Sequence, residues 1–193
     1  MTEILLLRHS IAEGNQDKRY LGCRTDTLLR PEGEAKAAEK AAKLPPCQAL
    51  YTSSMLRALQ TGCILFPELE PEIIPGMEEM DFGLFENKNY PELRDDPLYQ
   101  KWLDSNGTAP FPGGESREDF TGRVLLGFAD LRRRLRANPV ERAALVAHGG
   151  TLMAILSSLA NRRKDYFSWM APPCGGWLCR LEEDGTLTVL EKV

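Results

Sequence analysis

The sequence contains two histidines, and each follows closely on a short apolar segment. His9 comes one arginine after Ile4–Leu7, and His148 comes directly after Ala143–Ala147. Short apolar runs of this kind predict buried strands. Ligand sites in open α/β sheets form where such strands end. One histidine in this position is more often a packed side chain bonded to a backbone carbonyl, but two in equivalent positions favour a shared site.

Arginines stand beside both predicted strand ends. Arg8 precedes His9, and Arg57 follows Ser53-Ser54, either of which could cap the helix expected there. Gly149 would let the backbone come close to a ligand. Guanidinium groups and helix N-termini both favour phosphate, although a single arginine in such a place is commonly an exposed surface residue. The combination predicts a pocket for a phosphoryl group.

Other known routes to phosphate chemistry are missing from the sequence. There is no G-x-x-x-x-G-K-[ST] or G-x-G-x-x-G segment, so nucleotide binding by those loops is excluded. The C-x5-R signature of cysteine phosphatases is also missing. Of the five cysteines only Cys174 has an arginine six positions later, and that arginine, Arg180, falls inside a predicted strand and not in a phosphate-binding loop. With no C-x-x-C pair, the cysteines indicate reduced thiols in a cytoplasmic protein and no zinc site.

Alternating strands and helices are expected to position these residues. Strands are predicted at 3–7, 49–52, 72–74, 143–147, 177–181 and 186–190, and helices at 31–44, 54–65, 116–137 and 151–160. This alternation predicts a three-layer α/β/α sandwich with a mostly parallel central sheet. We expect one domain over residues 1–193, because no linker or repeat interrupts it.

The segment 76–114 differs from the rest because it is irregular and contains four prolines. We expect it to be an insertion that shapes the substrate site. Its aromatic residues, Tyr90, Tyr99, Trp102 and Phe111, could line the pocket mouth or simply pack the insertion.

Composition limits the partners. The chain has 193 residues and a net charge of −4, which gives no electrostatic support to nucleic-acid binding. No apolar run is long enough to span a bilayer. The expected partner is a small-molecule phosphate ester, and the sequence does not indicate an oligomeric state.

Several motifs occur in one order along the chain. They are Arg8-His9, Asn15, Arg19-Tyr20-x-Gly22, Asp26, Leu29–Gly33, Ser53-Ser54-x-x-Arg57-Ala58-x-Gln60-Thr61, Met77–Gly83, Pro112–Ser116 and His148-Gly149-Gly150. In this order they resemble the histidine phosphatase superfamily, the phosphoglycerate-mutase-like proteins. The compact length and the loop motifs are most similar to small phosphatases such as α-ribazole phosphatase.

The resemblance implies a phosphoglycerate mutase-like fold and metal-independent phosphoryl transfer with no cofactor. His9 would attack phosphorus and form a phosphohistidine. Arg8, Arg57, His148 and Asn15 would hold the phosphate oxygens, with Gly149 beside them. Glu79 would act as the acid and base, with Glu78 and then Asp81 as its competitors.

The sequence departs from the family in one place next to the nucleophile. Ser10 stands where the family usually has glycine, and its side chain could crowd the phosphate or donate to it. The predicted function is hydrolysis of a small phosphorylated metabolite, with α-ribazole phosphate as a candidate. A phosphoglycerate mutase-type phosphotransferase, a phosphohistidine-protein phosphatase and a non-catalytic phosphate-binding module are the alternatives.

Overall fold

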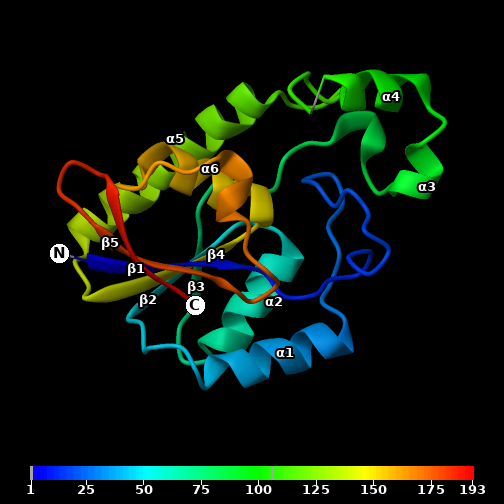
Figure 1. Ribbon diagram of the computed structural model, residues 1–193. Helices are drawn as coiled ribbons and strands as arrows, with labels where there is room; N and C mark the ends of the chain where they lie inside the picture. Colours follow the sequence, from blue (N-terminus) through cyan, green and yellow to red (C-terminus); the bar gives the residue numbers. More distant parts are fainter. Residues whose placement is uncertain (1, 106) are drawn as a thin grey trace.

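The computed structural model describes residues 2–105 and 107–193. These residues form one six-stranded sheet with the order β3-β2-β4-β1-β5-β6 (Figure 1). The strands are β1 (Thr2–Arg8), β2 (Ala49–Thr52), β3 (Pro71–Ile73), β4 (Arg142–Ala147), β5 (Gly176–Leu181) and β6 (Leu187–Lys192). The first four are parallel to one another, whereas β5 pairs antiparallel with β1 and β6 pairs antiparallel with β5.

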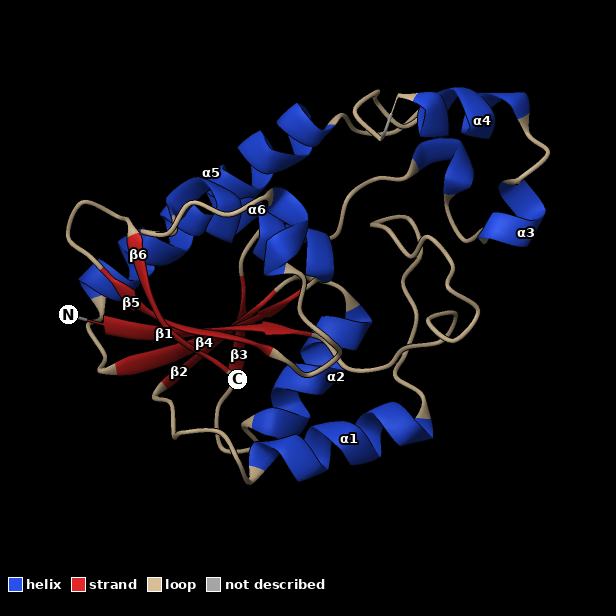
Figure 2. Cartoon of the chain, in the orientation of Figure 1, coloured by secondary structure: helices blue, strands red, loops and turns tan. Residues whose placement is uncertain are grey.

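Helices cover both faces of this sheet (Figure 2). The helices are α1 (Pro31–Ala41), α2 (Leu56–Leu65), α3 (Tyr90–Leu93), α4 (Pro97–Asp104), α5 (Arg117–Ala137) and α6 (Gly149–Leu159), with 3-10 turns η1 (Gly83–Phe85) and η2 (Tyr166–Trp169). Among the described residues, no helix combines the length and apolar character that a membrane crossing requires.

Strand β1 shows how the sequence separates the two faces. Its side chains alternate, so Leu5 and Leu7 pack in the core under α1 and α2, whereas Ile4 and Leu6 pack in the core under α5 and α6. All four are fully buried. A run of apolar residues is therefore required at β1, because both faces of the strand are covered. The predicted three-layer sandwich is confirmed.

The register of the central strands brings the two histidines together. β1 and β4 are neighbours in which Arg8 is paired with Ala147, so both strands end at the same level. The His9 backbone N–H then donates to the Ala147 carbonyl at 2.9 Å. His148 is the N-cap residue of α6, and it therefore emerges beside His9 at the carboxyl edge of the sheet.

Two helices start two residues away from the predicted position. α2 begins at Leu56 with Met55 at the N-cap, and neither Ser53 nor Ser54 caps it. The first free N–H, that of Leu56, instead donates to the Asp26 carboxylate at 2.8 Å. α6 begins at Gly149, two residues before the predicted start, because His148 already takes the extended conformation of an N-cap.

The segment 76–114 is more ordered than predicted, since it contains η1, α3 and α4; its residue 106 lies outside the described residues. α3 begins with a capping box between Asn89 and Glu92, and the Asp96 side chain caps α4. These short helices lie at one end of the molecule, beyond the start of α5 (Figure 1). Proline in the first turn of α3 and of α4 does not prevent helix formation, because the N–H it lacks would have no partner inside the helix.

Candidate active site

His9 is buried with its ring fixed by its neighbour. Its Nδ1 lies 2.6 Å from the Ser10 carbonyl oxygen. A carbonyl only accepts, so Nδ1 carries the proton and Nε2 keeps a free lone pair. The pKa of His9 lies well below its ordinary value because of burial and the nearby Arg57 and Arg8 charges. His9 is therefore a neutral imidazole with a nucleophilic nitrogen.

His148 faces His9 with a centroid separation of 5.2 Å between the rings. Its Nε2 lies 2.7 Å from the Ser53 hydroxyl, which comes from the end of β2. Its Nδ1 is buried and has no hydrogen-bond partner among the described residues. The pKa of His148 is also well below its ordinary value, through burial and then the charges of Arg57 and His9.

Arg8 and Arg57 supply positive charge at the same strand ends. The Arg8 Nη1 donates to the Ala171 carbonyl at 2.9 Å. Arg57 is fully buried, and its terminal nitrogens donate to the backbone carbonyls of Leu21, Gly22 and Thr25. In both arginines Nε is buried and has no partner among the described residues. Burial lowers the pKa of each guanidinium, and Glu79 opposes that effect.

These unpartnered atoms indicate what the site can bind. Buried polar atoms normally have a hydrogen-bond partner. Near His9, the Nε groups of Arg8 and Arg57 and the Nδ1 of His148 have no hydrogen-bond partner among the described residues. The two arginines also carry positive charge. An oxyanion such as phosphate satisfies donors of this kind. The predicted residues Arg8, His9, Arg57 and His148 are therefore brought together in an arrangement suited to an anion.

Glu79 is the acidic residue of the 77–81 segment that reaches this site. Its Oε2 accepts the Gly150 backbone N–H at 3.0 Å, and it lines the same cavity as Arg8. A Cβ on Gly150 would lie 2.2 Å from the Glu79 carboxylate, so only glycine allows this approach. At Gly149 a Cβ would have ordinary contacts of 3.6 Å or more with Arg8. The close backbone approach thus occurs at Gly150.

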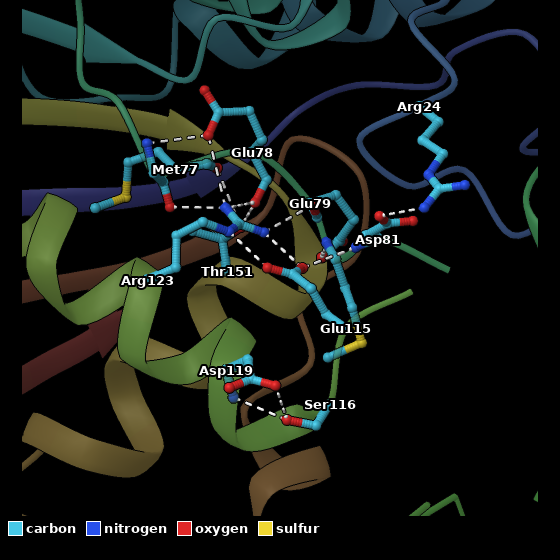
Figure 3. Close-up of polar contacts among 12 residues, drawn as sticks. Arg24, Met77, Glu78, Glu79, Asp81, Glu115, Ser116, Asp119, Arg123 and Thr151 are labelled. Atoms are coloured by element: carbon cyan, nitrogen blue, oxygen red, sulfur yellow. Dashed lines mark hydrogen bonds and ion pairs between the residues drawn. The ribbon is translucent and has the colours of Figure 1, made fainter. Parts of the chain in front are cut away.

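The competing acids are engaged elsewhere (Figure 3). Glu78 accepts from the Ser54 hydroxyl and the Gly76 N–H. Asp81 pairs with Arg24 at 2.8 Å. Of these three acids, Glu79 is the one that lines the cavity.

Arg123 fixes the backbone that carries Glu79 (Figure 3). Its guanidinium donates to the carbonyls of Gly76, Glu78 and Glu79. Glu115 holds the other side of the guanidinium at 2.8 Å. Sequence reasoning did not identify this contact, because Arg123 lies inside a helix predicted from its apolar stripe.

Glu86 fixes the loop that surrounds Arg57. Its carboxylate accepts the Gly22 N–H at 3.1 Å and the Thr25 hydroxyl at 2.6 Å. Its oxygens lie within 4.8 Å of ligand atoms of Cys23 and Asp81, but these hydrogen bonds already employ them. Glu86 and Ser53 are thus positioning residues that the sequence did not single out for this purpose. Ser53 could have been identified from the sequence in the same way as the histidines, because it directly follows a predicted strand.

Asn15 and Ser10 have local contacts. The Asn15 Oδ1 accepts the Ala12 N–H at 2.8 Å. Asn15 does not line the cavity that contains Arg8 and Glu79. The buried Ser10 hydroxyl donates to the Gly33 carbonyl at 2.7 Å, and its N–H donates to the Thr61 hydroxyl. Ser10 thus ties the end of β1 to α1 and α2. Its hydroxyl is occupied by that contact.

A cavity of about 640 Å³ is lined by Arg8 and Glu79 of this site, whereas His9, Arg57 and His148 lie behind its lining residues. Arg8, Gly149 and Gly150 contribute to it from the sheet edge, and Glu79 contributes from the segment 76–114. The remaining lining is largely apolar or aromatic, with Tyr20, Met80, Phe82, Trp102, Phe111 and Phe167. Of the aromatic residues expected at the mouth, Trp102 and Phe111 line the cavity, whereas Tyr99 is buried against Phe85 and Trp102. Cavities of this size hold small molecules.

Comparison with known proteins agrees with this geometry. The chain is 30% identical over 168 residues to the 2,3-bisphosphoglycerate-dependent phosphoglycerate mutase of Methylobacterium radiotolerans, covering 81% of this chain and 78% of that protein. A phosphoserine phosphatase mutant from Entamoeba histolytica, solved with phosphoserine, has a TM-score of 0.81 at 26% identity, covering 100% and 96% of the two chains.

The fold is also that of the α-ribazole phosphatase from Shigella flexneri, with a TM-score of 0.85 at 22% identity over 98% of this chain and 96% of that one. The sequence family that matches is the histidine phosphatase superfamily (branch 1), over residues 4–191. This match covers nearly the whole chain, including both histidines and the segment between them. The protein belongs to the histidine phosphatase superfamily.

Proposed function

We propose that this protein hydrolyses phosphate monoesters of small metabolites through a phosphohistidine formed on His9. The observation that carries the proposal is the His9 ring, whose Nδ1–H is committed to the Ser10 carbonyl while Nε2 stays free. Around that ring lie the unpartnered nitrogens of Arg8, Arg57 and His148. A neutral nucleophile inside a cluster of anion-binding groups suits attack on a phosphoryl group.

In the first step, His9 Nε2 attacks phosphorus and forms an N–P bond while the bond to the ester oxygen breaks. Glu79, in its protonated form, gives its proton to the departing oxygen, so the alcohol leaves neutral. The Ser10 carbonyl stabilises the positive charge that develops on the imidazole, because it already accepts the Nδ1–H. Arg8 and Arg57 offset the charge of the phosphoryl oxygens throughout.

In the second step, the Glu79 carboxylate takes a proton from water, and the water oxygen attacks phosphorus. The N–P bond breaks, phosphate leaves and His9 returns to the neutral form with a free Nε2. His148 donates to a phosphate oxygen from Nδ1, which requires the Ser53 hydroxyl to donate to Nε2. The scheme employs no metal or cofactor, because the two arginines provide the countercharge.

The segment 76–114 is proposed to select the substrate, since six of the cavity's aromatic and apolar wall residues lie in it. An apolar wall suits a leaving alcohol with a hydrophobic or aromatic part. α-Ribazole phosphate, with its aromatic base, is one candidate that fits this description. Phosphoserine and phosphoglycerate are small polar alternatives suggested by the names of the relatives.

The proposal is tested by hydrolysis of p-nitrophenyl phosphate in excess chelator. We expect turnover by the native protein and a loss of at least about a thousandfold in His9→Ala, because removal of a nucleophile eliminates the covalent route. Asn15→Ala tests the remaining predicted phosphate ligand. It is expected to change kcat/KM by less than about tenfold, since the Asn15 side chain accepts a hydrogen bond from the Ala12 N–H. Full activity in His9→Ala, or dependence on added metal, would overturn the proposal.

A further inference from the structure

Arg117 is a charged residue of the cavity wall that the proposed chemistry does not use. It lies at the start of α5 and lines the cavity with Arg8 and Glu79, which are the other charged lining residues. Arg8 and Glu79 belong to the phosphoryl site. Arg117 therefore provides a second positive group on the cavity wall.

Arg117 is held in place by aromatic rings. Its guanidinium carbon lies 4.9 Å from the Tyr166 ring centroid and 5.4 Å from that of Phe167. Its Nη2 donates to the Gly107 carbonyl at 3.3 Å. These contacts fix the guanidinium plane and leave most of its five N–H donors available.

The charge of Arg117 is not neutralised within the described part of the chain. Arg24, Arg123 and Arg19 each pair with a carboxylate at 2.8 Å. Within the residues described, no carboxylate lies within ion-pair distance of Arg117. An arginine against apolar walls with free donors is suited to a ligand carboxylate.

Tyr166 connects Arg117 to the surroundings of Glu79. Its hydroxyl donates to the Gly150 carbonyl at 3.3 Å, and the Gly150 N–H donates to Glu79. The Arg117 guanidinium lies over the same ring, with its carbon 4.9 Å from the ring centroid. One phenol ring therefore bridges from the neighbourhood of Glu79 to Arg117.

We infer that Arg117 binds a carboxylate on the alcohol part of the substrate, so that preferred substrates are phosphate monoesters with a hydrophobic body and a second anionic group. This inference rests on the proposed function, because it assigns the leaving alcohol to this end of the cavity. It favours carboxylate-bearing esters over α-ribazole phosphate, whose base has no anionic group. Arg117 is thus a specificity-determining residue.

The test compares para-carboxyphenyl phosphate with para-carbamoylphenyl phosphate, which has the same shape and no second charge. We expect the native protein to prefer the carboxylate ester in kcat/KM by about 10- to 100-fold, the effect of one charge-assisted hydrogen-bonded contact. Arg117→Gln should abolish the preference while leaving kcat/KM for the carbamoyl ester within about threefold. Arg117→Lys should retain part of the preference.

Arg133→Gln is the matched control, since Arg133 is an exposed arginine of the same helix that pairs with Asp130. It should keep the full preference. Equal hydrolysis of both esters by the native protein, with no change in Arg117→Gln, would overturn the inference and leave the proposed function intact. If neither these esters nor p-nitrophenyl phosphate is hydrolysed, the proposed function fails. The dissociation constants of both esters, measured in His9→Ala with and without Arg117→Gln, then decide the inference alone.

Discussion

The carboxyl edge of the sheet and the segment 76–114 border the same cavity but are built differently. At the sheet edge, buried side chains are fixed by backbone groups, as when Arg57 donates to three carbonyls and His9 to one. In the segment, Glu79 reaches the phosphoryl site, whereas the aromatic side chains of the wall, such as Phe82, Trp102 and Phe111, pack against one another. The first arrangement sets charge and tautomer, whereas the second sets the shape of the wall.

This difference separates the reaction from the choice of substrate. A change at the sheet edge disturbs atoms that must keep one geometry, so its effect should appear with every phosphate ester. A change in the wall alters contacts to one part of the ligand, so its effect should depend on the ester tested. Variants in the two regions test how far the reaction and the choice of substrate are separated.

The largest effect is expected from Glu79→Gln, which keeps the side-chain shape but removes the acid and base. Activity toward an alkyl phosphate should fall by about a hundred- to ten-thousand-fold, as for loss of a general acid. The fall should be smaller for p-nitrophenyl phosphate, because nitrophenolate leaves without a proton. Steady-state kinetics with the two esters measures this contrast.

Glu78→Gln is the matched control for that variant. Glu78 accepts from Ser54 and Gly76, and it does not line the cavity. Its replacement should reduce kcat by less than about tenfold with either ester. A larger loss in Glu78→Gln than in Glu79→Gln would reverse the assignment.

The next effect is expected from Arg57→Gln, since a buried cation and its contacts with the 21–25 loop are lost. We expect kcat/KM to fall by about a hundredfold and the free energy of unfolding by about 3 kcal/mol, because buried carbonyls lose charged donors. Arg133→Gln, at an exposed position, should leave both quantities unchanged. Enzyme kinetics and urea unfolding measure the two effects. Native activity in Arg57→Gln would contradict its assignment to the phosphoryl site.

A further effect follows from the lowered pKa of His9 and of His148. In the unfolded chain a histidine has a pKa of about 6.5, so between that value and the folded pKa only the unfolded chain is protonated. Stability is therefore lost as the pH falls below about 6.5, by up to about 1.4 kcal/mol per pH unit for each histidine.

Urea unfolding at about pH 7.5 and about pH 5.5 tests this pH dependence. The variant His148→Gln should lose stability less steeply, since one of the two titrating groups is removed. An unchanged free energy of unfolding across this range would show that the buried rings do not resist protonation.

The smallest effect is expected from Ser10→Ala. The Ser10 hydroxyl donates to Gly33 on the α1 side of the sheet, so its loss should cost about 1 kcal/mol of stability. The kcat for p-nitrophenyl phosphate should stay within about twofold of native, because this hydroxyl is engaged with the scaffold. A large change in kcat would place the hydroxyl in the reaction itself.

The sheet and most of the site were accessible from the sequence because they depend on local patterns. Apolar runs marked β1 and β4, and His9 and His148 followed them directly. The α5 stripe of Phe120, Val124 and Phe128 is fully buried, as its helical spacing predicted. Helical spacing and strand ends can be predicted from the sequence because each depends on one short segment of the chain.

Contacts between distant segments could not be predicted in the same way. Asp26 caps α2 in place of the adjacent serines, and Ser53 pairs with His148. Arg123, inside α5, fixes the backbone around Glu79. Each contact joins residues whose proximity depends on the folded register, which spacing along the chain does not reveal. The short helices of the segment 76–114 were missed because their caps, not an apolar period, define them.

The central claim is that His9 carries the phosphoryl group, and rapid acid-free quenching during turnover tests it most directly. The protein is mixed with an excess of a phosphate ester labelled on phosphorus, denatured in base and digested, and the labelled peptide is identified by mass spectrometry. Because a phosphohistidine survives base but not acid, we expect base-stable, acid-labile label on the peptide that contains His9. Label on the His148 peptide instead, or full turnover with no label on any peptide, would contradict the account.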